Sequence, residues 1–210
     1  DTKLTIRDIF SNPSIQQLEQ LINKYGNKEN RNVILKTSDK ENYSASTAQQ
    51  RIYYASSVGD TESMLYNIAG GILLEKIPDV SKLENSINEL IKRHSVLRTR
   101  FELKEGELLQ KIEENIDFKL KVSEAKYNDI DKAFSTFVRP FNLIGNILYD
   151  FELIKFENNQ ALLAMNIHHI ICDGKSSNTL LSELCEIYNG EKLEEINLEY
   201  KDFSEWEYKR

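Results

Sequence analysis

Cysteine and proline are scarce in this chain of 210 residues, which contains only two cysteines and three prolines. Cys172 and Cys185 are too few for a disulfide scaffold, and two thiols alone do not make a structural zinc site. Two isolated thiols suit a reducing compartment, so we expect a cytoplasmic protein.

The chain also lacks long apolar runs and an excess of positive charge. The best candidate for a membrane span, residues 161–171, is interrupted by Asn166, His168 and His169, whereas a spanning helix needs about 20 apolar residues. There are 27 Lys and Arg against 34 Asp and Glu, which gives a net charge of −7. Such a balance repels a phosphate backbone, so we expect neither a nucleic-acid partner nor a membrane partner.

The composition that remains is typical of a packed domain. Hydrophobic residues make up 40% of the chain, charged residues 29% and aromatic residues 10%, which lies outside the disordered and collagen-like classes. The length is sufficient to bury a core. The first residues, Asp1-Thr-Lys-Leu-Thr, are neither a start methionine nor a signal segment, so we expect a piece of a longer protein.

Hydrophobic periodicity and turn residues predict a mixture of helices and hairpins. Helices are predicted over residues 14–25, 46–58, 80–94, 129–138 and 175–188. Strands are predicted over residues 66–75, 98–104, 107–113, 118–122, 149–156 and 160–167. This order favours an α+β fold, a sheet covered by helices on one side, over a doubly wound parallel sheet. The polar segment from Gly26 to Asn42 is predicted to be a linker.

Two of the three histidines, His168 and His169, lie at the exit of the predicted strand 160–167. Successive strand residues point to opposite faces, so one histidine is expected to enter a cleft and the other to turn into the fold. The residues alone leave three interpretations open. A cleft-facing His169 is a reasonable general base, the pair is a structurally satisfied polar turn, or His169 and Asp173 bind a metal together with a further ligand such as His94.

The residues around the histidines have alternative roles as well. Asp173 either orients a histidine or pairs with an arginine to hold the loop, and its place in a tight turn favours the second. Gly174 is expected to adopt a conformation that a Cβ would resist, or to let a substrate approach the backbone. Cys172 is interpreted as a small filler of the loop. Arg98 belongs either to a solvated basic patch or to an inward pair with Asp173.

Four stretches together carry a family resemblance. Asn166–Gly174 resembles the His-His-x-x-x-Asp-Gly motif of nonribosomal peptide synthetase condensation domains. Ser46–Tyr53 resembles the first motif of that family, Arg93–Phe101 the second and Tyr200–Trp206 the fourth, in the family's order. Three positions depart from the family pattern and bear on donor and acceptor selectivity: Asn142, Tyr149 and Lys175.

The resemblance implies a domain organisation and a fold. Residues 1–26 resemble the C-terminal helices of a peptidyl carrier domain, residues 27–42 are the linker, and residues 43–210 resemble the N-terminal half of a condensation domain. The implied fold is a chloramphenicol acetyltransferase-like α/β sandwich with a mixed sheet covered by helices. In this family two such halves form a V, and the substrate arms enter the tunnel between them.

The resemblance also implies roles for individual residues. His169 is the implied catalytic histidine, which takes a proton from the acceptor amine or orients it. His168 and Asp173 are implied to hold the loop, with Arg98 as a candidate partner of Asp173. Gly174 keeps the loop backbone open beside the reacting carbonyl. No metal is implied, and no cofactor is bound directly, because the thioesters arrive on phosphopantetheine arms of other domains.

The implied function is formation of a peptide bond between two L-configured residues, as in secondary metabolism and antibiotic biosynthesis. The implied partners are an upstream donor and a downstream acceptor peptidyl carrier domain, the C-terminal half of the condensation domain, and the adenylation domain of the same synthetase. Two alternatives stay open. An epimerisation domain shares the double histidine, and a noncatalytic docking module would be expected to carry a damaged histidine motif.

Overall fold

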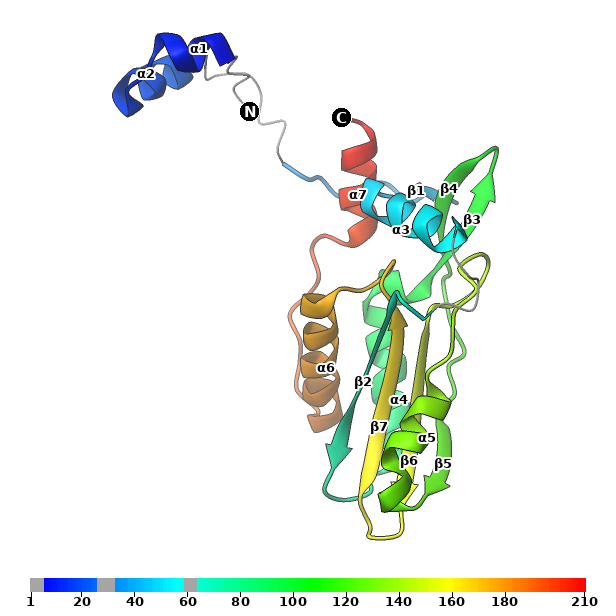
Figure 1. Ribbon diagram of the computed structural model, residues 1–210. Coiled ribbons are helices and arrows are strands. Elements are labelled where there is room, and N and C mark those ends of the chain that lie inside the picture. The colour runs from blue at the N-terminus through cyan, green and yellow to red at the C-terminus, as the bar shows by residue number, and fades with distance from the viewer. Residues whose placement is uncertain (1–5, 26–32, 59–63) are drawn as a thin grey trace. The chain divides into compact units, whose positions relative to one another are not determined.

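The computed structural model describes residues 6–25, 33–58 and 64–210 (Figure 1). These residues divide into two compact units, one that ends at Leu35 and one that extends from Lys36 to Arg210. In the described part of the chain no helix is both long and apolar enough to cross a membrane.

The first unit contains two helices, α1 (Ile6–Ser11) and α2 (Ile15–Tyr25). The second confirms the helix predicted over 14–25. Ser14 caps it: the backbone N–H of Gln17 donates to Ser14 Oγ, and the Gln17 side chain accepts from the Ser14 N–H, both at 3.2 Å. This reciprocal pair satisfies two backbone donors that the first turn of a helix leaves free. Of the predicted linker, residues 26–32 lie outside the described residues, and residues 33–42 form no helix or strand.

The second unit is organised around a four-stranded mixed sheet in the order β2-β7-β6-β5. Its strands are β2 (Asn67–Leu74), β5 (Lys121–Ala125), β6 (Tyr149–Phe156) and β7 (Ala161–His168). β5 and β6 run parallel, whereas β7 pairs antiparallel with both β2 and β6. The hairpin predicted between β6 and β7 is confirmed, and Asn159 in its turn has a positive φ of 65°, which asparagine tolerates.

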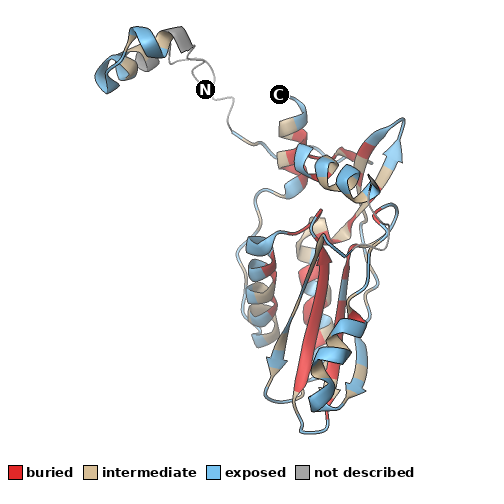
Figure 2. Ribbon diagram, viewed as in Figure 1, coloured by how far each residue is buried: buried red, intermediate tan, exposed pale blue. Residues whose placement is uncertain are grey.

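Helices cover this sheet on both faces, so the expectation of helices on one side only is wrong. α4 (Val80–Arg93) and α6 (Gly174–Asn189) contribute to the main core on one face. α5 (Ile130–Phe137) covers the other face around a second cluster, made of Phe137, Ile154, Phe156, Leu162 and Ala164. The reason is visible in Figure 2, where β7 is buried at all eight positions. A strand that is apolar on both faces must be covered on both.

A smaller sheet in the order β1-β4-β3 lies at the end of the main sheet (Figure 1). It consists of β1 (Tyr43–Ser44), β3 (Thr99–Lys104) and β4 (Glu107–Ile112). Glu105 and Gly106 both have positive φ, as a tight two-residue hairpin requires. Two helices flank this sheet, α3 (Thr47–Val58) and α7 (Tyr200–Tyr208). Short 3-10 turns occur at Ser95–Arg98 and Tyr127–Asp129.

Candidate active site

The two adjacent histidines are separated by the end of β7. His168 is the last residue of that strand and pairs with Asn67 of β2. Its side chain turns into the fold and is only 4% exposed. His169 is the first residue beyond the strand and is exposed. The opposite orientation that strand alternation predicts is therefore present.

The buried histidine is held in an aromatic and hydrogen-bonded environment. The ring of His168 lies 6.1 Å from that of Phe141, edge to face, and 6.2 Å from that of Tyr66. Its Nδ1 accepts a hydrogen bond of 3.2 Å from the backbone N–H of Ile170. Burial, and to a lesser degree the neighbouring His169, lowers the pKa of His168 to about 4. His168 is therefore neutral at pH 7 and serves as an acceptor inside the loop.

Backbone hydrogen bonds on both sides fix the position of the exposed histidine. The N–H of His169 donates to the carbonyl oxygen of Tyr66 at 2.7 Å, and the N–H of Ile171 donates to the carbonyl of His168 at 3.1 Å. These bonds hold the backbone where the chain turns after β7. His169 presents an exposed side chain from this fixed backbone, and catalytic side chains are often presented in this way by loops on a rigid scaffold.

Asp173 anchors the other end of the loop as the N-cap of α6. Its Oδ1 accepts from the N–H of Ser176 at 2.7 Å and from the hydroxyl of Ser176 at 2.6 Å. These bonds, the hydroxyl first, lower the pKa of the Asp173 carboxyl. A carboxylate at this position satisfies a free backbone donor and is stabilised by the helix dipole. This role was not predicted from the sequence, although an aspartate directly before a helical pattern is typical of an N-cap.

Arg98 does not pair with Asp173, so that expectation is wrong. Its guanidinium donates to four backbone carbonyl oxygens, those of Ile91, Lys92, Glu113 and Glu114. Arg98 thus joins the last turn of α4 to the end of β4 by using several of its donors on carbonyls that a helix terminus leaves free. Nothing in a single sequence distinguishes carbonyl partners of this kind from a carboxylate.

Gly174 does not adopt a left-handed conformation, in contrast to the first of the two expectations for it. It is the first residue of α6, and a Cβ built on it would meet no atom within 4 Å. Crowding within the described chain therefore does not require a glycine. The second expectation, an approach route for a substrate to the backbone, stays a prediction.

Two further side chains considered for chemistry have structural environments. Cys172 is buried, and burial, followed by Asp173, raises the pKa of its thiol to about 12, as expected of a loop filler. His94 lies 2.6 Å from a carboxylate oxygen of Glu183 in α6, which also accepts from Arg93 at 2.9 Å. Among the described residues, no three His, Cys, Asp or Glu side chains are grouped so that they could hold a metal ion.

A buried polar network that the sequence did not reveal brings the first motif to the loop. Gln49, at the start of α3, donates from Nε2 to the backbone carbonyl of Ile170 at 3.4 Å and to Gln110 Oε1 at 3.1 Å. Gln110 in turn donates to Ser204 Oγ of α7 and to the carbonyl of Ser44, both at 2.9 Å. The spacing Ser-x-x-Gln at 46–49 is typical of a capping box, but the contact of Gln49 with the loop spans 121 residues.

The fourth motif forms α7, whose polar residues bind to the neighbouring segments. Tyr200 OH lies 2.8 Å from Ser46 Oγ, and Glu205 accepts from the N–H of Ser44 at 2.8 Å and from Lys40. Asp202 accepts from the N–H of Thr37 at 2.8 Å. These hydrogen bonds go to Thr37, Lys40, Ser44 and Ser46 and not to the histidines, so the motif supports the neighbouring segments rather than the reacting groups.

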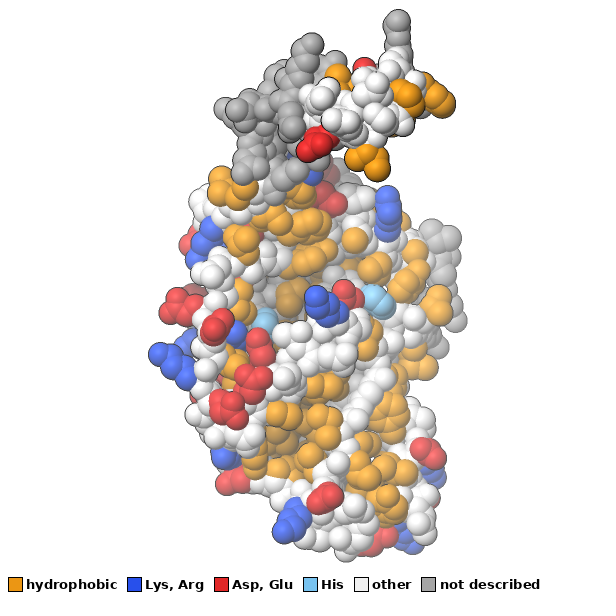
Figure 3. Space-filling model, turned by 90° about the vertical axis from the view of Figure 1, so that its left-hand side faces the viewer, with side chains coloured by type: hydrophobic (Ala, Val, Ile, Leu, Met, Phe, Trp, Pro, Cys, Tyr) orange, Lys and Arg blue, Asp and Glu red, His pale blue; other side chains and the backbone are white. Residues whose placement is uncertain are grey.

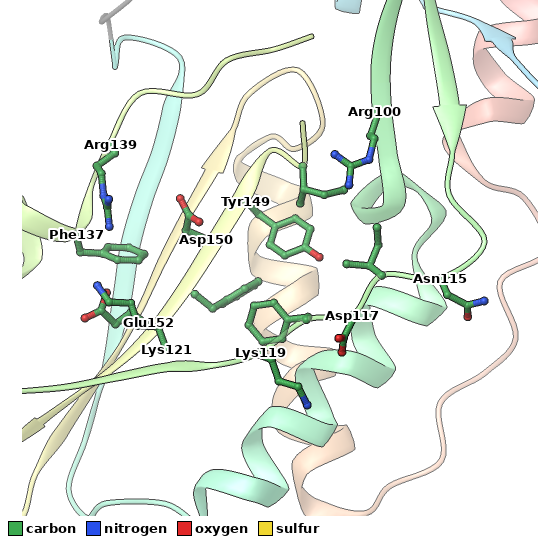
Figure 4. Close-up of a pocket in the computed structure, with 14 residues that line it drawn as sticks. Arg100, Asn115, Asp117, Lys119, Lys121, Phe137, Arg139, Tyr149, Asp150 and Glu152 are labelled. Atoms are coloured by element: carbon green, nitrogen blue, oxygen red, sulfur yellow. The ribbon is translucent and has the colours of Figure 1, made fainter. Parts of the chain in front are cut away.

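A cavity near β6 lies apart from the histidine loop. A cavity of about 460 Å³ at the edge of β6 is lined by Arg100, Arg139, Tyr149 and Asp150 among others (Figure 4), and by no residue of the loop. Tyr149, one of the departures from the family pattern, has a buried hydroxyl without a hydrogen-bond partner in the described chain. A second cavity of about 320 Å³ is lined by Ile171 of the loop.

Comparison with known proteins places this fold. The family model for the condensation domain matches residues 39–210. The chain belongs to the condensation-domain family. It is 34% identical over 206 residues to surfactin synthase subunit 2 of Bacillus subtilis (strain 168), covering 97% of this chain and 6% of that protein. It is 35% identical to gramicidin S synthase 2 of Brevibacillus brevis over 206 residues, covering 98% of this chain and 5% of that protein. The chain thus spans only a small part of these relatives.

Solved structures agree on the fold of this condensation-domain chain. The X-domain in its complex with OxyB from teicoplanin biosynthesis superposes with a TM-score of 0.79 at 19% identity, over 87% of this chain and 41% of that one. The starter condensation domain of the rhizomide synthetase RzmA superposes with a TM-score of 0.71 at 22% identity, over 81% and 44%. The chloramphenicol acetyltransferase-like α+β fold implied by the sequence motifs is confirmed.

Proposed function

We propose that this chain contributes the catalytic loop of an amide-forming condensation domain, with His169 as the catalytic residue. One observation carries the proposal: His169 is exposed at the end of a fully buried strand, and backbone hydrogen bonds on both sides fix its position. The motif histidine before it is buried with a pKa of about 4. Only His169 of the pair is therefore available to a substrate.

The proposed reaction joins two thioesters. The amine nitrogen of the acceptor attacks the carbonyl carbon of the donor thioester, an N–C bond forms, and the C–S bond breaks. His169 takes a proton from the attacking amine or orients it, and the departing thiolate ends as a thiol with one proton. His168 and Asp173 hold the loop from its two ends. Arg98 supports α4 instead and has no part in this step.

The open ground at Gly174 supports the approach of carrier-bound substrates. In the proposal the donor and the acceptor arrive on phosphopantetheine arms of an upstream and a downstream peptidyl carrier domain. A Cβ at Gly174 would meet nothing within 4 Å, so an arm can pass beside Asp173 without displacing the chain. The adenylation domain of the same synthetase would load the acceptor, and the proposed type is the one that joins two L-configured residues.

A second half-domain would complete the tunnel. The solved starter condensation domain is more than twice as long as the part that this chain covers, 44%. The face shown in Figure 3 carries α6 and the edge strand β2, and hydrophobic side chains are exposed on it; Leu73 of β2 is 43% exposed. In the proposed organisation residues 1–26 are the C-terminal helices of a carrier domain, 27–42 the linker and 43–210 the first half of the condensation domain.

Dipeptide formation tests the proposal. The complete protein that contains this chain is supplied with loaded donor and acceptor carriers, and the product is measured by mass spectrometry for wild type and His169→Ala. We expect the variant to lose the product while it keeps the wild-type melting temperature. His94→Ala is the matched control, because His94 pairs with Glu183, and it should keep activity within about threefold.

Three outcomes would overturn the assignment. Equal yields from wild type and His169→Ala would remove His169 as the catalytic residue. Exchange of the α-proton of the donor without an amide product would move the chain to epimerisation, and carrier binding with neither reaction would move it to a docking module.

A further inference from the structure

The environment of Gln49 is unusual for a glutamine near a helix start. Its side chain is 1% exposed, and all its hydrogen-bonding groups have partners. Oε1 accepts from the N–H of Ser46 at 2.9 Å, and Nε2 donates to Gln110 Oε1 at 3.1 Å and to the carbonyl oxygen of Ile170 at 3.4 Å. An amide has two N–H donors, and both are used here.

The carbonyl that Gln49 binds belongs to the residue directly after His169. Ile170 is 3% exposed, so this oxygen lies where water does not reach easily. The backbone N–H of Ile170 itself donates to His168 Nδ1. Among the described residues, Gln49 is thus the side chain from outside the loop that binds the loop backbone between His169 and α6. Without it, the carbonyl would have to turn toward solvent to replace the lost bond, because an unpaired buried carbonyl is costly.

The orientation of the Gln49 amide is itself fixed. A flip by 180° would place Oε1 against two acceptors, Gln110 Oε1 and the carbonyl of Ile170, and would leave the N–H of Ser46 facing a donor. Gln110 is held in the same way by the carbonyl of Ser44 and by Ser204 of α7. A buried network in which every member is satisfied is rigid, because each bond excludes the alternative rotamers of its neighbours.

We propose that Gln49 is a positioning residue for His169. It acts through the Ile170 carbonyl and holds the loop backbone at the place from which the imidazole meets the substrate amine. The inference rests on the proposed function, since it assigns Gln49 a part in that same reaction. A displacement of about 1 Å at a catalytic group costs roughly a hundredfold in rate, so the expected effect of losing Gln49 is a drop in kcat by about ten- to a hundredfold.

The test compares four variants in the complete protein, with kcat and KM measured for dipeptide formation. Gln49→Met removes the bond to Ile170, and we expect kcat to fall at least about tenfold, with KM for both carriers within about twofold of wild type. Gln50→Met is the matched control, because Gln50 is the adjacent glutamine and donates only to the carbonyl of Ala45. Gln110→Met removes a buried network member but leaves the bond from Gln49 to the loop, and its loss of kcat should be smaller.

Gln49→Glu supplies a readout that a general loss of packing would not move. The ionised carboxylate keeps the bond to the N–H of Ser46 but places an acceptor against the Ile170 carbonyl, whereas the protonated acid donates as the amide does. The ratio of variant kcat to wild-type kcat should therefore rise as the pH falls. The ratio for Gln49→Met should stay flat with pH.

Hydrogen exchange separates this inference from the proposed function, because it needs no turnover. In Gln49→Met the peptide that spans residues 165–173 should exchange faster than in Gln110→Met, even when the two variants have equal melting temperatures. Unchanged exchange and unchanged kcat in Gln49→Met would overturn the positioning role. Equal losses of kcat in Gln49→Met and Gln110→Met would also overturn it. A wild-type protein that forms no amide while the loop exchange responds as expected would overturn the proposed function alone.

Discussion

Replacement of Asp173 by alanine removes the N-cap of α6 and should destabilise the chain by about 1 kcal/mol at pH 7, within a range of roughly 0.5–2 for such caps. The carboxylate accepts two hydrogen bonds from Ser176, and alanine accepts none. For a unit of this size about 1 kcal/mol lowers the melting temperature by roughly 2–4 °C. Asp173→Asn keeps an acceptor of the same geometry, and asparagine caps helices about as well as aspartate, so it should cost only a few tenths of that.

The pH dependence of this stabilisation has a definite sign. Hydrogen bonds from Ser176 lower the pKa of Asp173 in the folded chain, whereas the unfolded value is about 3.9. The contribution of the carboxylate is therefore present above pH about 4 and is lost as the pH falls through the depressed folded pKa. Urea unfolding of wild type and Asp173→Ala, followed by circular dichroism, should give a stability difference that shrinks below pH about 4.

A double-mutant cycle with Arg98 separates the cap from an ion pair. Arg98 donates to backbone carbonyls and shares no partner with Asp173, so the coupling energy between Asp173→Ala and Arg98→Ala should be zero within about 0.5 kcal/mol. A coupling well above about 1 kcal/mol, or an Asp173→Asn variant as unstable as Asp173→Ala, would refute the cap and restore the ion pair.

Three further predictions concern the buried side chains. Because burial lowers the pKa of His168 to about 4 against about 6.5 when unfolded, the folded state should lose stability as the pH drops between these values. In urea unfolding at pH 7 and pH 4.5, the loss of stability between the two pH values should be smaller for His168→Gln than for wild type. An equal loss in the variant and in wild type would contradict the reasoning. Cys172 is buried with a pKa of about 12, whereas Cys185 is exposed. A thiol reagent at pH 8 should therefore label the folded chain once, and Cys185→Ser should abolish fast labelling. Rapid modification of Cys172, located by peptide mass spectrometry, would contradict this prediction. Leu163→Ala in β7, where the leucine is 4% exposed and belongs to the main core, should cost about 2–5 kcal/mol of unfolding free energy. Leu73→Ala in β2, at a position 43% exposed, should cost less than about 1 kcal/mol. Similar costs for both would argue against the burial of Leu163.

The helical cover on both faces of the main sheet has a signal in the sequence. Residues 161–165 are all apolar, and a strand without alternation is typical of burial on both faces. Prediction of helices on one side only followed from the order of the elements. The structure adds α5 on the second face, packed on Ile154, Leu162 and Ala164. For the short helix α7 the sequence offered no such signal. Its residues resemble a family motif, but no helix was predicted there.

Local patterns were sufficient wherever the deciding interaction lies within a few residues of chain. The opposite orientation of His168 and His169 follows from strand alternation, which is a property of the backbone alone. The hairpin between β6 and β7 follows from turn residues in the same way. The cap at Asp173 is equally local, since Ser176 lies three residues away, but Asp173 was expected to orient a histidine or to pair with an arginine instead.

Long-range partners were decided by the tertiary structure alone. Gln49 binds Ile170 across 121 residues and Arg98 binds Glu114 across 16, and both side chains could have met other acceptors of equal chemistry. A donor in a sequence specifies the kind of group that it needs, but the topology of the sheet determines which carbonyl or carboxylate comes within 3.5 Å. By itself the sequence determined most of the elements, the family and the exposed catalytic candidate. Only the tertiary structure brought Gln49 of α3, which is itself bound to Gln110 of β4, into contact with the loop that carries this candidate.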